Sequence, residues 1–365
     1  MNQSKTAMNR LFTKRLGVMI CTLFLISTLS FSQFDNADFL RSAPADGVKY
    51  IEAYVSPFVN AFGAGLNGGW YNTAKPHKLG GFDITTSFNL GFVPSSATTF
   101  DISSLGLSSN ITPVTGTVAS IAGPTDGGLP MTYTVNGVTL ASFDSPPGTD
   151  WKIIPVPTAQ VGIGLPLGTE LKVRLIPKIN IQDGDISLWG LGLMHSIMQY
   201  IPGNKLLPLD VSLFGGYTKL TGNVPLSIQP QAGYPNIISS TISLDDQNLS
   251  VDVKAFNINA IASLNLPVLT VYGGLGYCKT KTLIELTGNF PTPVLVTPAV
   301  AAPYAEYNDT GIKTGADFPS MDIENFSGVR ANIGLRVKLA VITIHADYTL
   351  AQYNVLSTGL GISFR

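Results

Sequence analysis

Apolar and polar side chains alternate along several stretches of this chain with a repeat of two residues. In the stretch VITIHADYTL at 341–350, one face carries Ile342, Ile344, Ala346, Tyr348 and Leu350, and the other carries Thr343, His345, Asp347 and Thr349. Successive side chains of a β-strand point to opposite sides, so this pattern predicts a strand with two different faces. The apolar face would pack on the core of a soluble sheet or lie in lipid on a membrane barrel.

The same alternation recurs along most of the chain. It is clear at 82–92, 170–179, 209–217, 328–338 and 353–365, and weaker at 249–264 and 268–281. Strands of about 9–11 residues are long enough to cross a hydrocarbon layer when tilted. Together with a further strand at 69–73, the pattern predicts about 12–14 strands, and the higher count applies if the hairpin signalled by Asn136-Gly137 joins the barrel wall.

The composition favours the membrane barrel over the soluble sheet. Only 12% of the residues are charged, which is about half of the ~25% found in soluble domains. The mean hydropathy is +0.26, yet no apolar run after the N-terminal one reaches the length of a transmembrane helix. Only helices and closed barrels satisfy their backbone groups in lipid. We therefore expect an all-β fold, a transmembrane antiparallel β-barrel.

The N-terminus predicts export. Basic residues precede the apolar run LGVMICTLFLISTLSF, which ends in small residues before Gln33, the pattern of a cleaved secretory signal. We expect residues 1–32 to be this signal peptide and the mature chain to lie in the outer membrane of a Gram-negative bacterium. Cleavage removes Cys21 and leaves Cys278, too few cysteines for a disulfide framework. The net charge of −1 and the lack of a basic run argue against a nucleic-acid partner.

The lengths of the connections predict the orientation of the barrel. Bacterial outer-membrane barrels have short periplasmic turns and longer external loops. If the last strand ends in the periplasm, the connections at 166–169, 265–267 and 339–340 are periplasmic. The long connections at 108–157, 221–247 and 286–327 then fall outside. The connection at 196–208 is an exception, because it is long and periplasmic, and we expect a short helix there.

Residues 48–66 break the strand pattern. Their apolar side chains recur at helical spacing, and Pro57 would kink or split the helix. We expect a helical segment within 33–67, followed by the barrel at 68–365. This segment would plug the lumen, sit at the periplasmic mouth, or serve only as a surface helix. The plug candidates on its apolar face are Val48, Ile51, Val55, Phe58 and Phe62.

Charged residues on the polar faces of the strands are the candidates for lining the lumen. They carry both signs, so no ring of one sign sets an ion selectivity. Mixed charge fits either a narrow pore or a lumen filled by salt bridges. The candidates are Glu170, Lys172, Arg174, Asp210, Asp252, Lys254, Arg330, Arg336, Lys338, His345 and Asp347.

The sequence offers little for catalysis. It contains three histidines and no GxSxG motif. His345, Asp347 and Ser357 would meet on the lumen side of the last hairpin, where we expect His345 and Asp347 to be partly ion-paired. A hydrolase also needs an oriented acid and an oxyanion site, for which there is no motif. We therefore expect no enzyme, no cofactor and no metal site.

Two motifs carry a family resemblance. The stretches GLNGGWYNTAKPHKLGGFDIT at 65–85 and HSIMQYIPG at 195–203 resemble a family of uncharacterised Gram-negative outer-membrane barrels, loosely similar to the long-chain fatty-acid transporters. The resemblance implies a barrel that passes or binds a small molecule, hydrophobic or otherwise. The alternative is a structural or docking barrel without transport. In the transporters an N-terminal hatch plugs the barrel, a role that residues 48–66 would take.

The same resemblance implies two partners. Outer-membrane lipid would surround the barrel. The barrel-assembly machinery would read the C-terminal aromatic residue, which Phe364 matches, although Arg365 follows it. No ligand-binding residue of the transporters has a counterpart motif in this chain.

Overall fold

The structure is a computed structural model that describes residues 44–126, 128–181, 184–201, 208–230, 242–323 and 327–364. All of them belong to one compact unit, Asn36–Arg365. The expected signal peptide at 1–32 and the beginning of the expected segment at 33–67 lie outside the described residues.

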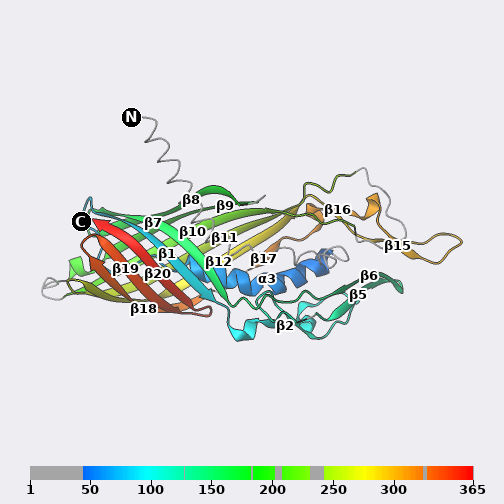
Figure 1. The fold of residues 1–365 in the computed structure, drawn as a ribbon, viewed down its shortest axis with the longest axis horizontal. Helices are drawn as coiled ribbons and strands as arrows, with labels where there is room; N and C mark the ends of the chain where they lie inside the picture. The colour runs from blue at the N-terminus through cyan, green and yellow to red at the C-terminus, as the bar shows by residue number, and fades with distance from the viewer. Residues whose placement is uncertain are drawn as a thin grey trace, which may run out of the picture. The chain divides into compact units, whose positions relative to one another are not determined.

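Ten antiparallel strands close into a barrel (Figure 1). They belong to a sheet of eleven strands, of which the short β17 (Met321–Ile323) pairs only with β12. β11 pairs with β12, and β1 pairs with β20, which closes the ring. The wall strands are β1 (Phe82–Phe92), β7 (Ile153–Leu165), β8 (Thr169–Ile181), β9 (Gly184–Ser196), β10 (Leu209–Pro225), β11 (Asn248–Asn265), β12 (Leu269–Thr287), β18 (Ser327–Leu339), β19 (Ile342–Leu350) and β20 (Val355–Phe364).

The predicted class is confirmed, whereas the predicted count of 12–14 strands is wrong. Residues 69–73, expected as a strand, are irregular chain inside the barrel. The Asn136-Gly137 hairpin does form, and both residues have the positive φ, 50° and 78°, that a type I′ turn requires. However, it belongs to a separate sheet outside the wall, made of β3 (Ile111–Thr112), β5 (Pro130–Val135) and β6 (Val138–Asp144).

The wall strands divide their side chains between an outer apolar face and a largely polar inner face. In β19, His345 and Asp347 are 3% and 5% exposed, whereas Ile344 and Leu350 are 53% and 59% exposed. We call the exposed apolar side chains of the outer face the apolar belt. Each of the ten strands contributes to it, for example through Ile84, Ile163, Leu175, Leu193, Leu213, Ile258, Leu275, Ile333, Ile344 and Leu360.

The two ends of the barrel differ in their connections. The turn end holds the start of β1, the end of β20 and the connections 166–168, 197–208, 266–268 and 340–341. The loop end holds the long connections 93–152, 226–247 and 288–326. Strand register thus puts the three long connections at one end, as the sequence predicts, and the short turn 351–354 between β19 and β20 lies at the same end. The longer connection at the turn end contains the short 3-10 helix η4 (Met198–Tyr200).

The long connections carry small elements of their own. Short strands pair in the sheets β2–β4 and β13–β16, and a further pair is β14–β15. These elements are β2 (Thr99–Asp101), β4 (Thr117–Ala119), β13 (Asn289–Pro291), β14 (Val294–Val296), β15 (Tyr304–Glu306), β16 (Ile312–Thr314), η2 (Ser95–Ala97), η3 (Ile102–Leu105), η6 (Asp309–Gly311) and η7 (Gly315–Asp317).

A 23-residue helix, α3 (Pro44–Leu66), precedes the barrel. Pro57 lies inside the helix, and α3 is not split there. Within the described part of the chain, no helix is both long enough and apolar enough to cross a bilayer. The first turns of α3 contact the loop-end connection 93–152. Ser108 of this connection donates its N–H to Asp46 Oδ1 at 3.0 Å, and Lys49 Nζ donates to the Gly106 carbonyl at 2.6 Å.

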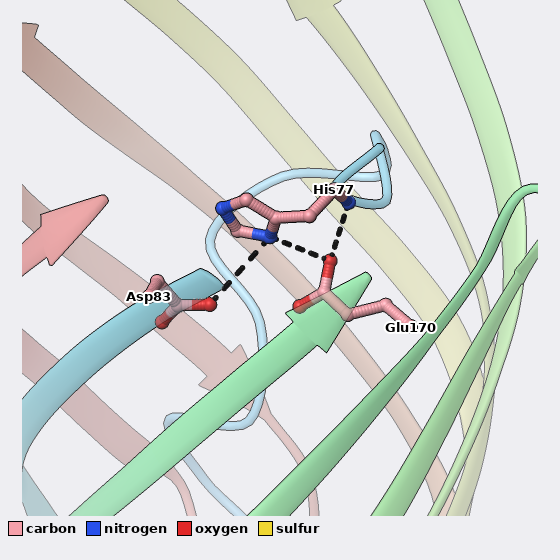
Figure 2. A group of neighbouring side chains, drawn as sticks. All are labelled: His77, Asp83 and Glu170. Carbon is pink, nitrogen blue, oxygen red and sulfur yellow. Dashed lines mark hydrogen bonds and ion pairs between the residues drawn. The ribbon is translucent and has the colours of Figure 1, made fainter. Parts of the chain in front are cut away.

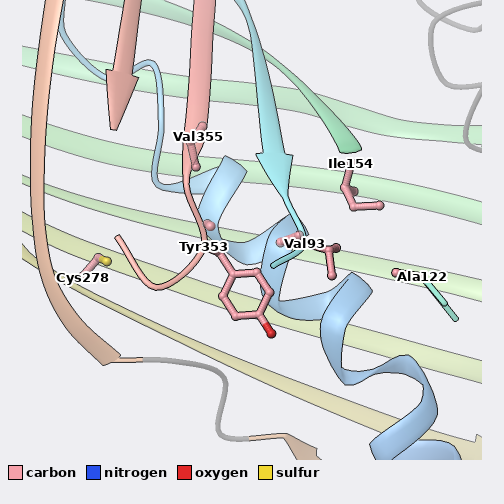
Figure 3. Packing of buried hydrophobic residues seen from close by; sticks show 8 residues of the cluster. Val93, Ala122, Ile154, Cys278, Tyr353 and Val355 are labelled. Atoms are coloured by element: carbon pink, nitrogen blue, oxygen red, sulfur yellow. The ribbon is translucent and has the colours of Figure 1, made fainter. Parts of the chain in front are cut away.

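The last turns of α3 lie inside the wall (Figures 1 and 3). The cluster drawn in Figure 3 joins Ala61 and Ala64 of the helix to Val93, Ile154 and Val355 at the loop-end ends of the wall strands. Residues 67–81, which we call the lumen segment, then run through the barrel from α3 to the start of β1. The helix is therefore not at the mouth that the C-terminus occupies, which was one of the expected positions.

Candidate functional site

A buried arginine of the wall holds the C-terminal end of α3. Arg174 of β8 is 0% exposed and donates to the carbonyl oxygens of Leu66 at 2.8 Å and Gly68 at 2.7 Å. Its guanidinium also lies 3.7 Å from the centre of the Trp70 ring, in the geometry of a cation–π contact. Its Nε donates to Gln160 Oε1 at 3.1 Å.

A second arginine reaches the same helix end from another part of the wall. Arg330 of β18 donates to the Asn67 carbonyl at 2.7 Å and to Thr349 Oγ1 at 3.2 Å. The last carbonyls of a helix have no partner within the helix and carry the negative end of its dipole. The last turn of α3 contains no basic residue of its own. The two wall arginines therefore satisfy and neutralise this helix end.

Aromatic residues of the lumen segment fill the middle of the barrel. Trp70 packs against Phe214 with ring centres 5.6 Å apart, and Tyr71 packs against the same ring at 5.5 Å. Gly192 of the wall has no side chain between its backbone and the indole. A Cβ at this position would come within 2.8 Å of Trp70 Cζ3. Tyr71 also donates its hydroxyl to Asn332 Oδ1 at 2.8 Å. Glycine in the wall thus makes room for the indole.

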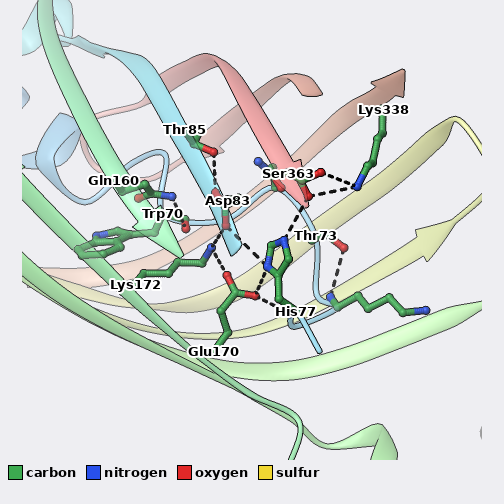
Figure 4. Close-up of polar contacts among 12 residues, drawn as sticks. Trp70, Thr73, His77, Asp83, Thr85, Gln160, Glu170, Lys172, Lys338 and Ser363 are labelled. Atoms are coloured by element: carbon green, nitrogen blue, oxygen red, sulfur yellow. Dashed lines mark hydrogen bonds and ion pairs between the residues drawn. The ribbon is translucent and has the colours of Figure 1, made fainter. Parts of the chain in front are cut away.

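A charged cluster holds the other end of the lumen segment at the turn end (Figures 2 and 4). Glu170 Oε2 accepts from the His77 backbone N–H at 2.8 Å and lies 2.9 Å from His77 Nδ1. Asp83 Oδ1 lies 3.7 Å from the same nitrogen. Lys172 Nζ lies 2.5 Å from Glu170 Oε1 and 3.7 Å from Asp83 Oδ1.

The cluster has the residue types of a metal site, because ligand atoms of His77, Asp83 and Glu170 all lie within 4.8 Å of one another. The Lys172 ammonium, however, already supplies positive charge to both carboxylates at short range. Buried charges are stable when they are paired and hydrogen-bonded in this way. The cluster therefore fits an internal ion-pair network that fastens His77 to the wall.

Two small cavities lie beside this cluster. One of about 70 Å³ opens near the turn end and is bounded by Lys75, Arg336 and Lys338 among others. One of about 10 Å³ lies deeper, beside Lys172 and Thr343. A single water needs roughly 10–15 Å³ measured in this way. These spaces suit a few waters.

The lumen is apolar toward the loop end. Leu66 of α3 packs there against the inner face of the wall, with Phe62 beside it. The wall side chains of this cluster are Val156, Leu188, Leu220, Val253 and Ala255. The end of α3 thus covers apolar wall, whereas the lumen segment covers polar and charged wall.

Pairing between β7 and β8 is incomplete beside this apolar region. The register runs from Leu165–Thr169 only to Gln160–Arg174, although β7 continues to Ile153 and β8 to Ile181. Elsewhere in the wall, β1 pairs with β7 over the full length of β1, from Phe82 to Phe92. We call the unpaired stretch between β7 and β8 the seam.

Prolines explain the seam. The Val93 N–H donates to the Lys152 carbonyl, so even-numbered residues of β7 turn their backbone groups toward β1 and odd-numbered ones toward β8. Pro155 and Pro157 therefore lack the N–H groups that would pair with β8. In β8, the bond from the Ser196 N–H to the Gly168 carbonyl turns the odd-numbered residues toward β7 by the same rule, and Pro177 is one of them.

Nine of the expected lumen residues lie on the inner face. Four of them, Glu170, Lys172, Arg174 and Arg330, contact the lumen segment or its ion pairs as described above. Asp210 accepts from Asn265 at 2.7 Å, and Lys338 reaches Ser363 Oγ at 3.1 Å. The inner-face residues of the expected set are Glu170, Lys172, Arg174, Asp210, Arg330, Arg336, Lys338, His345 and Asp347.

The prediction that Asp252 and Lys254 line the lumen is wrong. The buried inner residues of β11 are odd-numbered, such as Val253 and Asn257, and Lys254 is exposed on the outer face. Asp252 pairs there with Lys219 of β10 at 3.0 Å. The physical reason is that the inner face of β11 is apolar at its loop end, where it meets α3, so polarity does not mark the lumen there.

The plug candidates divide between the two halves of α3. Val48 and Val55 are buried among the loop-end connections, and Ile51 is half-buried. Phe58 and Phe62 stack with ring centres 6.4 Å apart and pack on the cluster of Figure 3.

A tyrosine fixes the middle of α3 to the loop-end connections. Tyr54 donates its hydroxyl to the Pro147 carbonyl at 2.8 Å, and burial raises the pKa of this phenol to about 12. The hydroxyl is therefore a neutral donor at any physiological pH. The helix thus spans from the loop-end connections into the barrel.

His345 and Asp347 do not form the expected ion pair. The register does place them opposite Gly359 and Ser357. Asp347 Oδ2 instead accepts from Tyr272 at 3.0 Å, while His345 Nε2 lies 3.4 Å from Ser87 Oγ. The two side chains turn to different neighbours, because each has a nearer polar partner on an adjacent inner position.

The most important contacts of the lumen were not predicted. Trp70, Tyr71 and His77 lie in a stretch expected as strand and connection, and nothing in their spacing shows that they fill a barrel. Asp83 was within reach of the sequence, because it begins the polar face of the strand at 82–92. Glu170, which shares His77 and Lys172 with Asp83, lies on another strand, and alternation alone cannot bring these two strands together.

Together these features define a closed β-barrel whose own N-terminal segment occupies its lumen. Residues 8–364 match the model of a family of unknown function, DUF6588, and the chain belongs to this family. The resemblance to an uncharacterised barrel family is thereby confirmed. No curated protein matches the chain.

Several solved outer-membrane β-barrels are similar to it. The translocator domain of the autotransporter NalP from Neisseria meningitidis shares 13% identity and a TM-score of 0.30, covering 89% of this chain and 99% of that one. The attachment invasion locus protein Ail of Yersinia pestis shares 8% identity and a TM-score of 0.25, covering 78% of this chain and 98% of that one. A FadL homologue of Pseudomonas aeruginosa shares 10% identity and a TM-score of 0.19, covering 78% and 88%. At these values none of them supports a functional argument.

Proposed function

We propose that this protein is an outer-membrane β-barrel of a Gram-negative bacterium that passes or binds a small hydrophobic molecule. The apolar belt supports the membrane location. Val329, Ile333 and Leu360 are 81%, 68% and 59% exposed, and similar side chains continue around the ten strands. Continuous apolar surface of this extent is unfavourable in water, and lipid would cover it.

The seam beside the apolar part of the lumen carries the proposal of a hydrophobic ligand. Val156 lies on the inner face of β7 in the stretch that is not paired with β8, and it packs against Leu66 of α3. An apolar molecule that replaced the end of α3 would meet the same apolar wall. It would reach lipid through the seam without crossing the charged turn end.

A disulfide across the seam tests the path. Ala159 and Leu175 follow the last registered pair, so the double variant Ala159→Cys with Leu175→Cys would join β7 to β8 on oxidation. The matched control is Ser187→Cys with Thr221→Cys, a registered pair of β9 and β10. Uptake of the hydrophobic dye N-phenyl-1-naphthylamine by cells expressing each protein is the readout.

Oxidation is expected to slow dye uptake in the seam variant, and reductant should restore it, while the control variant is unaffected. Equal uptake with the seam closed would refute the lateral path. Uptake of the same dye also distinguishes the proposed function from the alternative of a structural or docking barrel. That alternative predicts no uptake above cells lacking the protein, both for the full chain and for a variant without residues 44–66.

The same proposal gives the C-terminal aromatic residue a role in assembly of the barrel. Phe364 ends the last strand, is 43% exposed and packs against Phe82 with ring centres 5.1 Å apart. This aromatic end is the feature that the barrel-assembly machinery would bind. Outer-membrane lipid is then the partner of the apolar belt.

A further inference from the structure

The chain crosses the barrel once before it forms the wall. β8 contacts the lumen segment at two points. Arg174 binds the Gly68 carbonyl, and Glu170, which lies nearer the turn end, binds the His77 N–H. On β11 the contacts run the same way, from Asn257, which donates to Asn67, to Ser263, which accepts from the Ala74 N–H. The lumen segment therefore descends from the loop half of the barrel to the turn end in one pass.

The start of α3 lies beyond the opposite end. Both Oδ atoms of Asp46 accept from Ser108, and Lys49 donates to Gly106, in the connection between β1 and β7. The rings of Tyr50 and Phe100 pack there at 5.4 Å. Ala45, next to these contacts, is exposed. The start of α3 thus lies at the loop end, whereas β1 begins and β20 ends at the turn end.

We propose that the barrel displays the start of α3 on the cell surface, with its lumen as the conduit across the membrane. This inference rests on the proposed outer-membrane location. Short turns and the C-terminal strand end face the periplasm in bacterial barrels, and the loop end faces outward. The start of α3 is then on the outer side, although an exported chain first reaches the periplasm. The start of α3 must therefore pass through the lumen, or be enclosed as the wall closes around it.

Cysteine labelling on intact cells tests this topology. The reporter is Ala45→Cys, in a Cys278→Ala background of the full chain. Val300→Cys marks the loop end, where Val300 is 98% exposed, and Leu266→Cys marks the turn end, where Leu266 is 47% exposed. A membrane-impermeant maleimide is added before or after permeabilisation of the outer membrane.

The inference predicts that Ala45→Cys is labelled on intact cells to the same extent as Val300→Cys, and that Leu266→Cys is labelled only after permeabilisation. If Val300→Cys is labelled on intact cells but Ala45→Cys behaves like Leu266→Cys, the inference is overturned and the outer-membrane barrel stands. If the two end markers do not differ, the membrane location and the inference fall together. Heat-dependent gel mobility of each variant verifies that it has folded.

Discussion

The guanidinium of Arg174 lies 3.7 Å from the centre of the Trp70 ring while it holds the carbonyl oxygens of Leu66 and Gly68. One wall residue thus contacts both the end of the internal helix and the first aromatic residue of the lumen segment. Because the arginine is fully buried, each of these contacts is made away from bulk water. Arg174 therefore links the position of the helix to the stability of the wall.

Replacing Arg174 with Met should loosen the internal helix. The change leaves buried carbonyls without donors, and each such group costs about 1–3 kcal/mol. We expect a lower unfolding midpoint in urea and faster cleavage of α3 by added protease in detergent. The control is Lys178→Met on the same strand, whose 65% exposed side chain pairs with Asp185 at 3.1 Å. Equal behaviour of the two variants would show that Arg174 does not hold the helix.

Acidification should strengthen the docking of α3 through Glu52. Burial, and then the nearby Asp322 carboxylate, raise the pKa of Glu52 above its ordinary value of 4.5. A carboxyl with a raised folded-state pKa disfavours the docked state once it ionises, so docking stability is lost as pH rises through that pKa and regained as pH falls. Protease resistance of α3 should therefore increase on acidification, and Glu52→Gln should show a smaller pH effect. An unchanged pH profile in Glu52→Gln would contradict this account.

Alternation predicted the faces of strands whose outer side is apolar and whose inner side is polar. At 341–350 the pattern placed His345 inside and Ile344 outside, where the structure has them. It failed at Asp252 and Lys254, because the wall around them is apolar inside and polar outside near the loop end. The polarity of that stretch is set by α3, a partner far away in the sequence.

The lumen segment was beyond the reach of pattern reasoning for a related reason. Trp70 and Tyr71 are aromatic residues in a short stretch of chain, and a strand of the wall can have the same composition and length. They are inside because Gly192 and its neighbours leave space for the indole and because Arg174 covers it. These contacts join residues more than 100 positions apart, so spacing along the chain carries no sign of them. The helix itself was predictable from its period.

Backbone exchange should expose the seam. The Leu175 N–H points toward β7 just beyond the last registered pair, whereas Val173 is registered with Val161. Hydrogen–deuterium exchange in lipid nanodiscs should therefore be faster at Leu175 than at Val173. Replacing Pro157 with Val restores one donor toward β8, and we expect it to slow exchange at Leu175. Equal protection of Leu175 and Val173 in the natural chain would mean that the seam is paired.

An outward charge should destabilise the barrel in lipid. Ile344 is 53% exposed in the apolar belt, and Arg at such a position costs about 2–4 kcal/mol near the bilayer midplane. Ile344→Arg should lower refolding yield into lipid vesicles, with Ile344→Val as the mild control. Thr343 is 2% exposed on the inner face, so a charge placed there would not be hydrated. Thr343→Arg should therefore also destabilise the barrel, through overpacking. Ile344→Arg that refolds like Ile344→Val would argue against lipid contact.

The most direct test of the membrane-barrel account is quenching of Trp189 by lipid. The chain has three tryptophans. Trp189 is 45% exposed on the outer face, whereas Trp70 is 2% exposed in the lumen. The measurement is tryptophan fluorescence in vesicles whose acyl chains carry bromine, a contact quencher. The account predicts strong quenching of the natural chain, loss of most of it in Trp189→Phe, and no such loss in the control Trp151→Phe. Quenching that is absent, or unchanged in Trp189→Phe, would contradict the claim that the apolar belt lies in lipid.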